Sequence, residues 1–182
     1  MLCTISRRIA LALTWAWIVA TSLAAEPSQQ GHNEHLGPLA RFVGGEWVVH
    51  GKWTNGEPLQ ARTTYEWGIA NQIIKSKTYV TNPAKGQYQR YEGIFAWHPE
   101  KKSLVQYSFS FDGHLTETIV EVVDPDTIHV GWKPFESGRD TPIRQVLKFE
   151  GKDQFVWTVL MKDKDNWKKL IEATWERKGQ TK

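Results

Sequence analysis

Apolar and polar residues alternate along most of the chain after residue 45, and the alternation breaks at short turn signals. A period of two is typical of strands that bury one face. The strongest turn signal is Asn55-Gly56, which favours a tight hairpin. The pattern predicts ten strands, over residues 46–54, 59–70, 73–81, 88–97, 104–111, 115–123, 127–133, 143–150, 154–162 and 167–177.

One earlier stretch has the spacing of a helix. Its apolar residues recur at intervals of three and four: Leu36, Leu39, Phe42 and Val43. Pro38 suits the first turn of such a helix, where a missing backbone N–H costs nothing. We expect a short helix over residues 36–43, lying across one end of the strands as a lid.

The predicted strands are joined by short, turn-rich links. Links of this length join antiparallel neighbours, because a parallel pair needs a long crossover. Each strand has one aromatic-rich face and one polar face, as a closed meander requires. The predicted fold is therefore all-β, an antiparallel up-and-down β-barrel of about ten strands with one short N-terminal helix. A sandwich of two sheets is the alternative.

The first residues resemble an export signal. Arg7 and Arg8 precede an apolar run over residues 9–23, and small residues follow it. We expect residues 1–25 to be a signal peptide, residues 26–35 a flexible linker and residues 36–178 the barrel domain, in a periplasmic or secreted protein. An uncleaved membrane anchor is the alternative, and both the general secretory and the twin-arginine routes stay open.

Cysteine and charge exclude several classes of protein. The only cysteine of the 182 residues is Cys3, in the predicted signal, which leaves the barrel without a disulfide or thiol chemistry. The formal charge of +3 falls to about +1 without Arg7 and Arg8, that is, 21 basic against 20 acidic residues. Nucleic-acid binding requires a basic stripe, and the sequence contains none.

Three motifs and a glycine-tryptophan pair resemble those of a known superfamily. They are Gly45-Glu46-Trp47, Tyr65-Glu66-Trp67, Phe95-Ala96-Trp97-His98-Pro99 and Glu172-Ala173-Thr174-Trp175-Glu176-Arg177. Over residues 36–178 the chain resembles the lipocalin and wider calycin superfamily, most closely exported bacterial lipocalin-like domains whose function is uncharacterised. The resemblance implies a barrel; it names no ligand.

The same resemblance pairs the start of the first strand with the end of the last. Gly45 and Trp47 look like the opening motif, and Arg177 looks like the basic residue that packs over its tryptophan. Antiparallel closure places these ends side by side independently of the family. A guanidinium over an indole contributes roughly 0.5–2 kcal/mol. We interpret Gly45, Trp47 and Arg177 as a structural latch.

Aromatic residues on the expected inner faces are the candidate ligand-binding set. A small barrel either packs its interior with side chains or holds one small molecule, and both outcomes are open here. The candidates for ligand binding are Tyr65, Trp67, Arg90, Tyr91, Phe95, Tyr107, Phe109, Trp132 and Trp157.

The titratable residues give little support for catalysis. We expect Glu66, Arg90 and Glu92 to face outward, with an inward ligand-orienting cluster as the alternative. Asp112 and His114 flank a turn glycine, and their interpretation as an acid-base pair is weaker than that of ordinary turn chemistry. No nucleophile elbow, phosphate loop or zinc motif is present.

No cofactor or metal is predicted. Nitrobindin-like barrels hold heme through a late histidine, whereas the last histidine here, His129, alternates away from the apolar face of its strand. His32 and His35 have the spacing of a helical metal pair, but their polar surroundings favour solvent exposure. Heme is therefore not expected.

Taken together, the sequence favours an exported, non-enzymatic barrel that binds a small hydrophobic molecule. It has no nucleic-acid partner and no stable membrane span after signal cleavage. The first alternative is an isomerase, cyclase or hydrolase on the same barrel, which needs a buried titratable group among Glu66, Arg90, Glu92 and Asp112. The second is a structural or interaction module with a filled interior. The sequence does not indicate the oligomeric state.

Overall fold

The computed structural model describes residues 31–132 and 141–179. The predicted signal peptide and the first half of the predicted linker, residues 26–30, lie outside these residues. The elements are η1 (Glu34–Phe42), β1 (Glu46–Lys52), β2 (Pro58–Gly68), β3 (Ile73–Asn82), β4 (Gly86–His98), β5 (Ser103–Ser110), β6 (Leu115–Asp124), β7 (Thr127–Trp132), β8 (Ile143–Phe149), β9 (Gln154–Asp163) and β10 (Asn166–Lys178). Each strand ends within two residues of the range that the alternation predicts.

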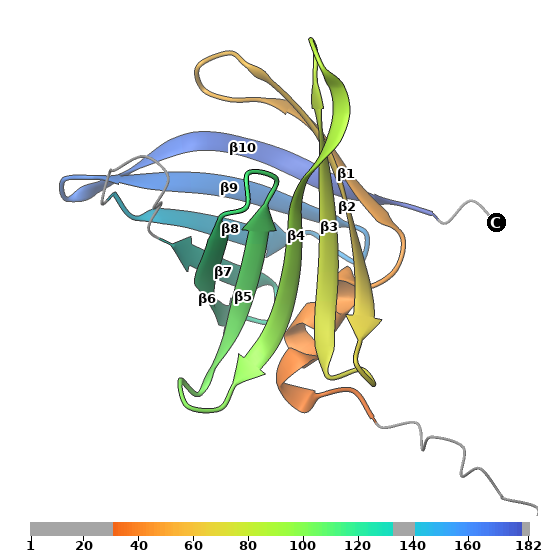
Figure 1. Cartoon of the computed structure of the whole chain (residues 1–182). Coiled ribbons are helices and arrows are strands. Elements are labelled where there is room, and N and C mark those ends of the chain that lie inside the picture. Colours follow the sequence, from red (N-terminus) through yellow and green to blue (C-terminus); the bar gives the residue numbers. More distant parts are fainter. Residues whose placement is uncertain (1–30, 133–140, 180–182) are drawn as a thin grey trace, which may run out of the picture.

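The ten strands form one closed antiparallel barrel, as predicted, and the sandwich is excluded. Each strand pairs with its neighbour in the chain, and β10 pairs with β1 to complete the circle. Strands β2–β5 run upright in Figure 1, and β8–β10 cross the view at a steep angle to them. The interior is therefore enclosed between two differently oriented walls.

One end of the barrel is covered by η1, a 3-10 helix that begins two residues before the predicted range. The Asn33 side chain caps it by accepting a hydrogen bond from the backbone N–H of His35. Arg41 ties its last turn to the barrel by donating to the carbonyls of Pro125 (2.9 Å) and Gly151 (3.1 Å). The predicted lid is thus present.

The two early histidines lie against tryptophans of the barrel. The His35 ring stacks on Trp97 with 3.8 Å between the ring centroids. The His32 ring is tilted against Trp67 at 4.4 Å. Both histidines are solvent-exposed, as expected, but their rings extend the attachment of η1 to β2 and β4.

The aromatic part of the hydrophobic core lies at the η1 end. Apolar residues of the helix, of the start of β1 and of the β8–β9 hairpin meet there, among them Leu36, Leu39, Phe42, Trp47, Phe149 and Phe155. Trp47 is fully buried, and its indole N–H donates to the Phe42 carbonyl at 2.9 Å. This half of the barrel interior is consequently filled.

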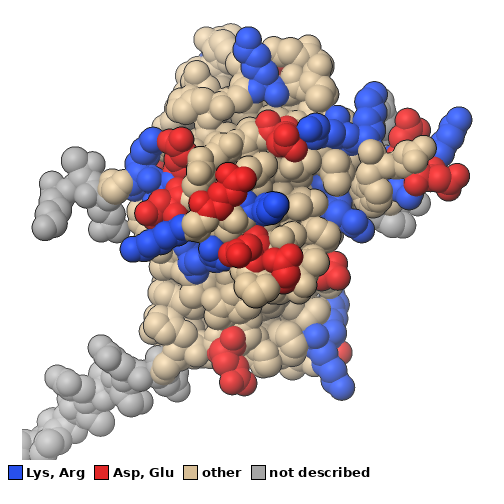
Figure 2. Space-filling model, turned by 180° about the vertical axis from the view of Figure 1, so that it is seen from behind, with Lys and Arg blue, Asp and Glu red and all other residues tan. Residues whose placement is uncertain are grey.

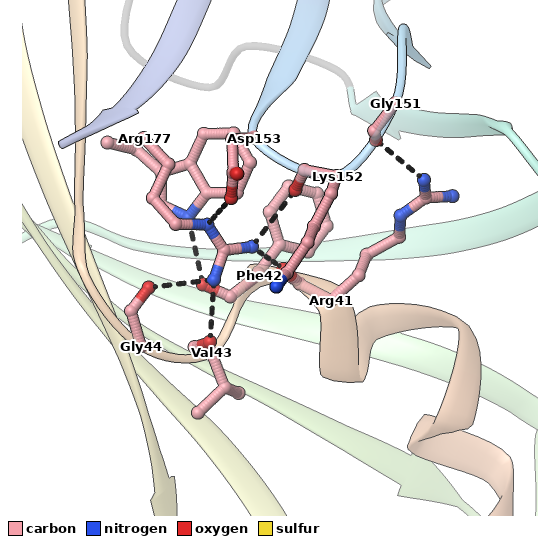
Figure 3. Close-up of polar contacts among 9 residues, drawn as sticks. Arg41, Phe42, Val43, Gly44, Gly151, Lys152, Asp153 and Arg177 are labelled. Atoms are coloured by element: carbon pink, nitrogen blue, oxygen red, sulfur yellow. Dashed lines mark hydrogen bonds and ion pairs between the residues drawn. The ribbon is translucent and has the colours of Figure 1, made fainter. Parts of the chain in front are cut away.

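Strand closure brings Arg177 onto Trp47. The two residues are register partners between β1 and β10, and the guanidinium lies 4.5 Å from the indole centroid. Arg177 also donates to the carbonyls of Val43 and Gly44, both at 3.1 Å (Figure 3). One side chain thereby joins the last strand to the chain segment that links η1 to β1.

Surface charges are mixed rather than gathered by sign. On the face shown in Figure 2, Lys and Arg side chains lie among Asp and Glu side chains. Several form exposed ion pairs, such as Lys75–Glu66 at 2.8 Å and Lys169–Glu172 at 3.2 Å. Pairs of this kind contribute little to stability.

Two adjacent glycines give a matched test of the latch. Both have positive φ, +86° for Gly44 and +72° for Gly45. A Cβ at Gly44 meets no atom within 4 Å, whereas one at Gly45 falls 2.9 Å from Arg177 Cγ and 3.0 Å from the Lys178 carbonyl oxygen. We expect Gly44→Ala to cost about 1 kcal/mol of unfolding free energy through backbone strain alone, and Gly45→Ala about 1–2 kcal/mol more. Equal losses in urea unfolding would show that the end of β10, with the Arg177 side chain and the Lys178 carbonyl, moves away freely.

Candidate functional site

Beyond the aromatic end of the core, the barrel encloses a cavity of about 860 Å³. It extends from aromatic residues above η1 to the turn between β1 and β2, where the exposed residues Glu57 and Pro58 line it. The barrel is therefore neither wholly filled nor wholly empty. A volume of this size is in the range of small-molecule sites.

The floor of the cavity is aromatic. Tyr65 from β2 and Phe95 from β4 line it, with 6.2 Å between their ring centroids. Phe42 of η1 packs under Tyr65 at 5.0 Å, and Phe155 and Trp175 stack beside them at 5.9 Å. Burial raises the pKa of the Tyr65 hydroxyl well above its ordinary value, so that it stays a neutral hydrogen-bonding group.

The wall formed by β2–β6 carries most of the uncharged polar side chains of the cavity: Thr63, Ser76, Thr78, Gln106, Ser108, Thr116 and Thr118. Apolar residues of β2–β4 line the same wall between them, among them Leu59, Ala61, Val80 and Phe95. The hydroxyls of Thr63 and Thr78 are 2.9 Å apart and bond to each other across the strands. The remaining polar side chains form no hydrogen bond with another described residue.

The opposite wall, formed by β7–β10, is apolar. It presents mainly aliphatic and aromatic side chains: Val130, Ile143, Phe155, Trp157, Val159, Leu170 and Trp175. Its one amide, Gln145, accepts a hydrogen bond from the Trp157 indole N–H through its oxygen, which leaves the amide NH2 as the polar group of this wall. The Trp175 indole nitrogen has no acceptor among the described residues, but it is buried and does not reach the cavity surface.

Arg90 faces the cavity because β4 contains a bulge. On β3, Thr78 pairs with Tyr91 and Tyr79 pairs with Gln89, which leaves Arg90 as the extra residue. A bulge interrupts the alternation of faces, so that two consecutive residues can share one. Arg90 and Tyr91 accordingly both line the cavity.

Within residues 31–132 and 141–179, Arg90 forms no close ion pair, although the Asp112 carboxylate interacts with its charge. Its guanidinium lies 4.3 Å from the centroid of Phe111, a cation-π contact, and forms no ion pair with a described carboxylate. Among the described residues, Arg90 is the only basic side chain that lines the cavity, and Glu57 is the only acidic one. The outer part of the cavity therefore suits an anionic or strongly polar group.

Five of the nine predicted ligand-binding residues line the cavity: Tyr65, Arg90, Tyr91, Phe95 and Trp157. Trp67 faces inward but lies below the cavity, against His32 at the η1 end. The side chain of Trp132 lies outside the described part of the structure. The tenth-strand residue Trp175 was not among the predictions, although its aromatic side chain completes the floor.

The predicted orientation of β5 is wrong. Tyr107 and Phe109 point outward, and Phe109 is 45% exposed. Gln106 pairs with the inward residue Phe95, so the cavity-lining residues of β5 are Gln106 and Ser108. In most barrels the aromatic face of a strand points inward, whereas in β5 the inner face carries hydroxyl and amide groups. The pairing of Gln106 with Phe95 is what identifies this face as the inner one.

The other candidate catalytic groups lie away from the cavity. Glu66 faces outward and pairs with Lys75, and Glu92 is exposed beside Gln89, both as expected. The expected outward position of Arg90 is wrong, because of the bulge. Asp112 lies in an exposed turn, where a hydrogen bond from the Ser110 hydroxyl lowers the pKa of its carboxyl.

No three or more His, Cys, Asp or Glu side chains gather into a possible metal site among the described residues. Within the same residues, no helix has the length and apolarity needed to cross a lipid bilayer. His129 lies 3.8 Å from the Glu121 carboxylate at the surface and does not line the cavity. The polar groups that line the cavity are hydroxyls, amides, the Arg90 guanidinium and, at the outer turn, the Glu57 carboxylate.

Comparison with known proteins adds no functional assignment. No protein family and no curated protein matches the chain. Among solved structures, one described as a redesigned beta barrel is similar, with 16% sequence identity and a TM-score of 0.42. That match covers 76% of this chain and 94% of the other. The fold and site define the chain as a closed ten-stranded antiparallel barrel with an internal cavity.

Proposed function

We propose that the chain is an exported, lipocalin-like barrel that binds a small, largely hydrophobic molecule and leaves it chemically unchanged. The observation that carries the proposal is the 860 Å³ cavity between an aromatic floor and the β1–β2 turn. Export is supported by the basic and apolar residues before residue 25. The lipocalin-like assignment is supported by the packing of Arg177 on Trp47.

The cavity favours binding over catalysis. Among the described residues that line it, no histidine occurs, and the only carboxylate is Glu57 at the outer turn. General acid-base chemistry needs a positioned proton donor or acceptor near the substrate. Aromatic and aliphatic side chains instead supply the apolar area from which ligand affinity derives. Arg90 then orients the ligand by attracting its polar or acidic end.

Fluorescence titration with 1-anilinonaphthalene-8-sulfonate tests this proposal, because the probe is an aromatic anion that brightens in apolar sites. We expect saturable binding by the purified protein. Val159→Phe fills the cavity and is expected to weaken binding at least about tenfold. Arg90→Gln removes the cation and is expected to weaken it about tenfold, the value of one charged hydrogen bond.

Thr158→Phe is the matched control, because Thr158 is the neighbouring residue on β9 and bonds to Glu172 on the outer side. It should leave the affinity within about twofold of the parent protein. Circular dichroism establishes that each variant is folded. Equal affinities for the Val159→Phe and Thr158→Phe proteins would contradict binding in the cavity.

A further inference from the structure

Polar burial in this protein is concentrated on one side of the cavity. Among the described residues, only three polar side chains are buried: Thr63, Ser76 and Thr118, at 4%, 6% and 4% exposure. All three line the cavity, on β2, β3 and β6. A barrel that served only to enclose hydrocarbon would have apolar residues at such positions, because an unpaired buried hydroxyl is costly.

Most of these polar groups have no partner within the described chain. The Thr63 hydroxyl bonds to that of Thr78, but the hydroxyls of Ser76 and Thr118 form no hydrogen bond with a described residue. Neither hydroxyl oxygen belongs to the side-chain atoms that are both unbonded and inaccessible to solvent. Both oxygens therefore expose some polar surface to the cavity. They are consequently available to water or to a ligand.

Strand register arranges further polar groups into a row. Ser76 pairs with Gly93, Gly93 with Ser108, and Ser108 with Thr116, across four neighbouring strands. Gly93 leaves room for its neighbours, since a Cβ there would fall 2.6 Å from the Ser76 hydroxyl and 3.4 Å from the Gln106 amide nitrogen. Ser76, Ser108 and Thr116, with Thr118 two residues further along β6, therefore form a polar strip along one wall.

The facing wall has the opposite character. Phe155, Trp157 and Val159 of β9 present apolar side chains to the cavity, and the oxygen of the single amide, Gln145, is already bonded to the Trp157 indole. A ligand in the cavity thus meets hydrogen-bonding groups on one side and hydrocarbon on the other. A flexible acyl chain would displace water from the polar strip without replacing its hydrogen bonds.

We propose that the ligand is a rigid, ring-based facial amphiphile, with hydroxyl or carbonyl oxygens along one face and hydrocarbon on the other. The oxygens lie against the strip on β3–β6, and the hydrocarbon face lies against β7–β10. This inference rests on the proposed binding function and specifies its ligand class. A site built to bond to hydroxyl groups discriminates against analogues that lack them in the right place.

Two bile acids serve as probes of this geometry. Chenodeoxycholate and ursodeoxycholate have the same formula, charge and ring skeleton, and differ only in the face to which one hydroxyl points. Chenodeoxycholate carries both hydroxyls on one face. We expect it to bind at least about tenfold more tightly in calorimetric titration below its micelle concentration, the effect of one lost hydrogen bond in a buried site.

Substitutions in the polar strip test whether its hydroxyl groups cause the preference for chenodeoxycholate. Thr118→Val keeps the side-chain shape and removes the hydroxyl, and it should bring the two affinities within about threefold. Ser76→Ala provides a second test should the first variant not fold. Thr64→Val is the control, since Thr64 alternates to the outer face of β2, and it should preserve the full preference.

The outcomes distinguish a failure of the proposed ligand class from a failure of the proposed binding function. Equal affinities for the two bile acids, or a preference that survives both Thr118→Val and Ser76→Ala, would overturn the facial amphiphile. Saturable binding of 1-anilinonaphthalene-8-sulfonate that depends on Val159 would then still support a binding barrel. Absence of binding by all three probes would contradict both proposals.

Discussion

Replacing Trp47 with alanine is expected to lower the free energy of unfolding by about 3–5 kcal/mol. Trp47 is fully buried and is in ring contact with Phe42, Phe149 and Phe155, whose centroids lie 6.1, 6.4 and 4.9 Å away. Truncation leaves a cavity at the filled end of the barrel and removes the indole donor to the Phe42 carbonyl. Urea unfolding followed by far-ultraviolet circular dichroism measures the loss.

Trp167→Ala is the matched control for this change. Trp167 lies at the start of β10, outside the core cluster, and its ring contacts Arg144 and Lys162. Its truncation should cost about 1 kcal/mol or less, the ordinary value for a residue near the surface. Comparable losses for Trp47→Ala and Trp167→Ala would mean that Trp47 does not plug the barrel end.

The arrangement of the strands could be predicted because the turns and the alternation agree. Asn55-Gly56 leaves only a hairpin between β1 and β2, and each later turn repeats this constraint. Closure then follows from the position of the latch. Once ten antiparallel strands succeed one another, Arg177 reaches Trp47 only if β10 pairs with β1.

The cavity walls were harder to predict because sequence periodicity fixes two faces without saying which is inner. In β5, the aromatic face of Tyr107 and Phe109 is outside, and the face of Gln106 and Ser108 is inside. Choosing the more hydrophobic face as the inner one is wrong for β5, because its inner face contributes polar side chains to the cavity wall. A strand in a cavity-bearing barrel need not bury its most apolar face.

The bulge at Arg90 left no clear signal in the sequence. An ideal alternation through residues 88–97 puts Arg90 on the outer face with Glu92. One extra residue in the β3–β4 ladder turns Arg90 inward and leaves Glu92 outside. The cation that most distinguishes this cavity thus depends on a local irregularity of pairing, which side-chain patterns do not record.

Arg177→Met is expected to lower the free energy of unfolding by about 3 kcal/mol, since methionine keeps much of the apolar stem but none of the donors. The guanidinium donates to the carbonyls of Arg41, Val43 and Gly44, and its Nε lies 3.0 Å from the Asp153 carboxylate (Figure 3). The side chain is 17% exposed, so water replaces these bonds only in part.

Besides the lower global stability, Arg177→Met should destabilise one region of the protein in particular. Arg177 holds the segment between η1 and β1 against β10, so its removal should release η1 before the strands separate. We expect faster amide hydrogen exchange over residues 36–43 in Arg177→Met, with protection in β3–β6 unchanged under native conditions. Arg177→Lys, which retains the charge but not the forked donors, should fall between Arg177→Met and the parent protein.

Lys178→Met distinguishes the latch from a general loss of positive charge at the end of β10. Lys178 is the adjacent residue, its side chain is 58% exposed, and it pairs with Glu176 at 2.7 Å. An exposed pair of this kind contributes little, so the variant should unfold within about 0.5 kcal/mol of the parent protein. If Arg177→Met and Lys178→Met behaved alike, the carbonyls around Arg177 would have to be satisfied by solvent, and β10 would close the barrel through its backbone pairing with β1 alone.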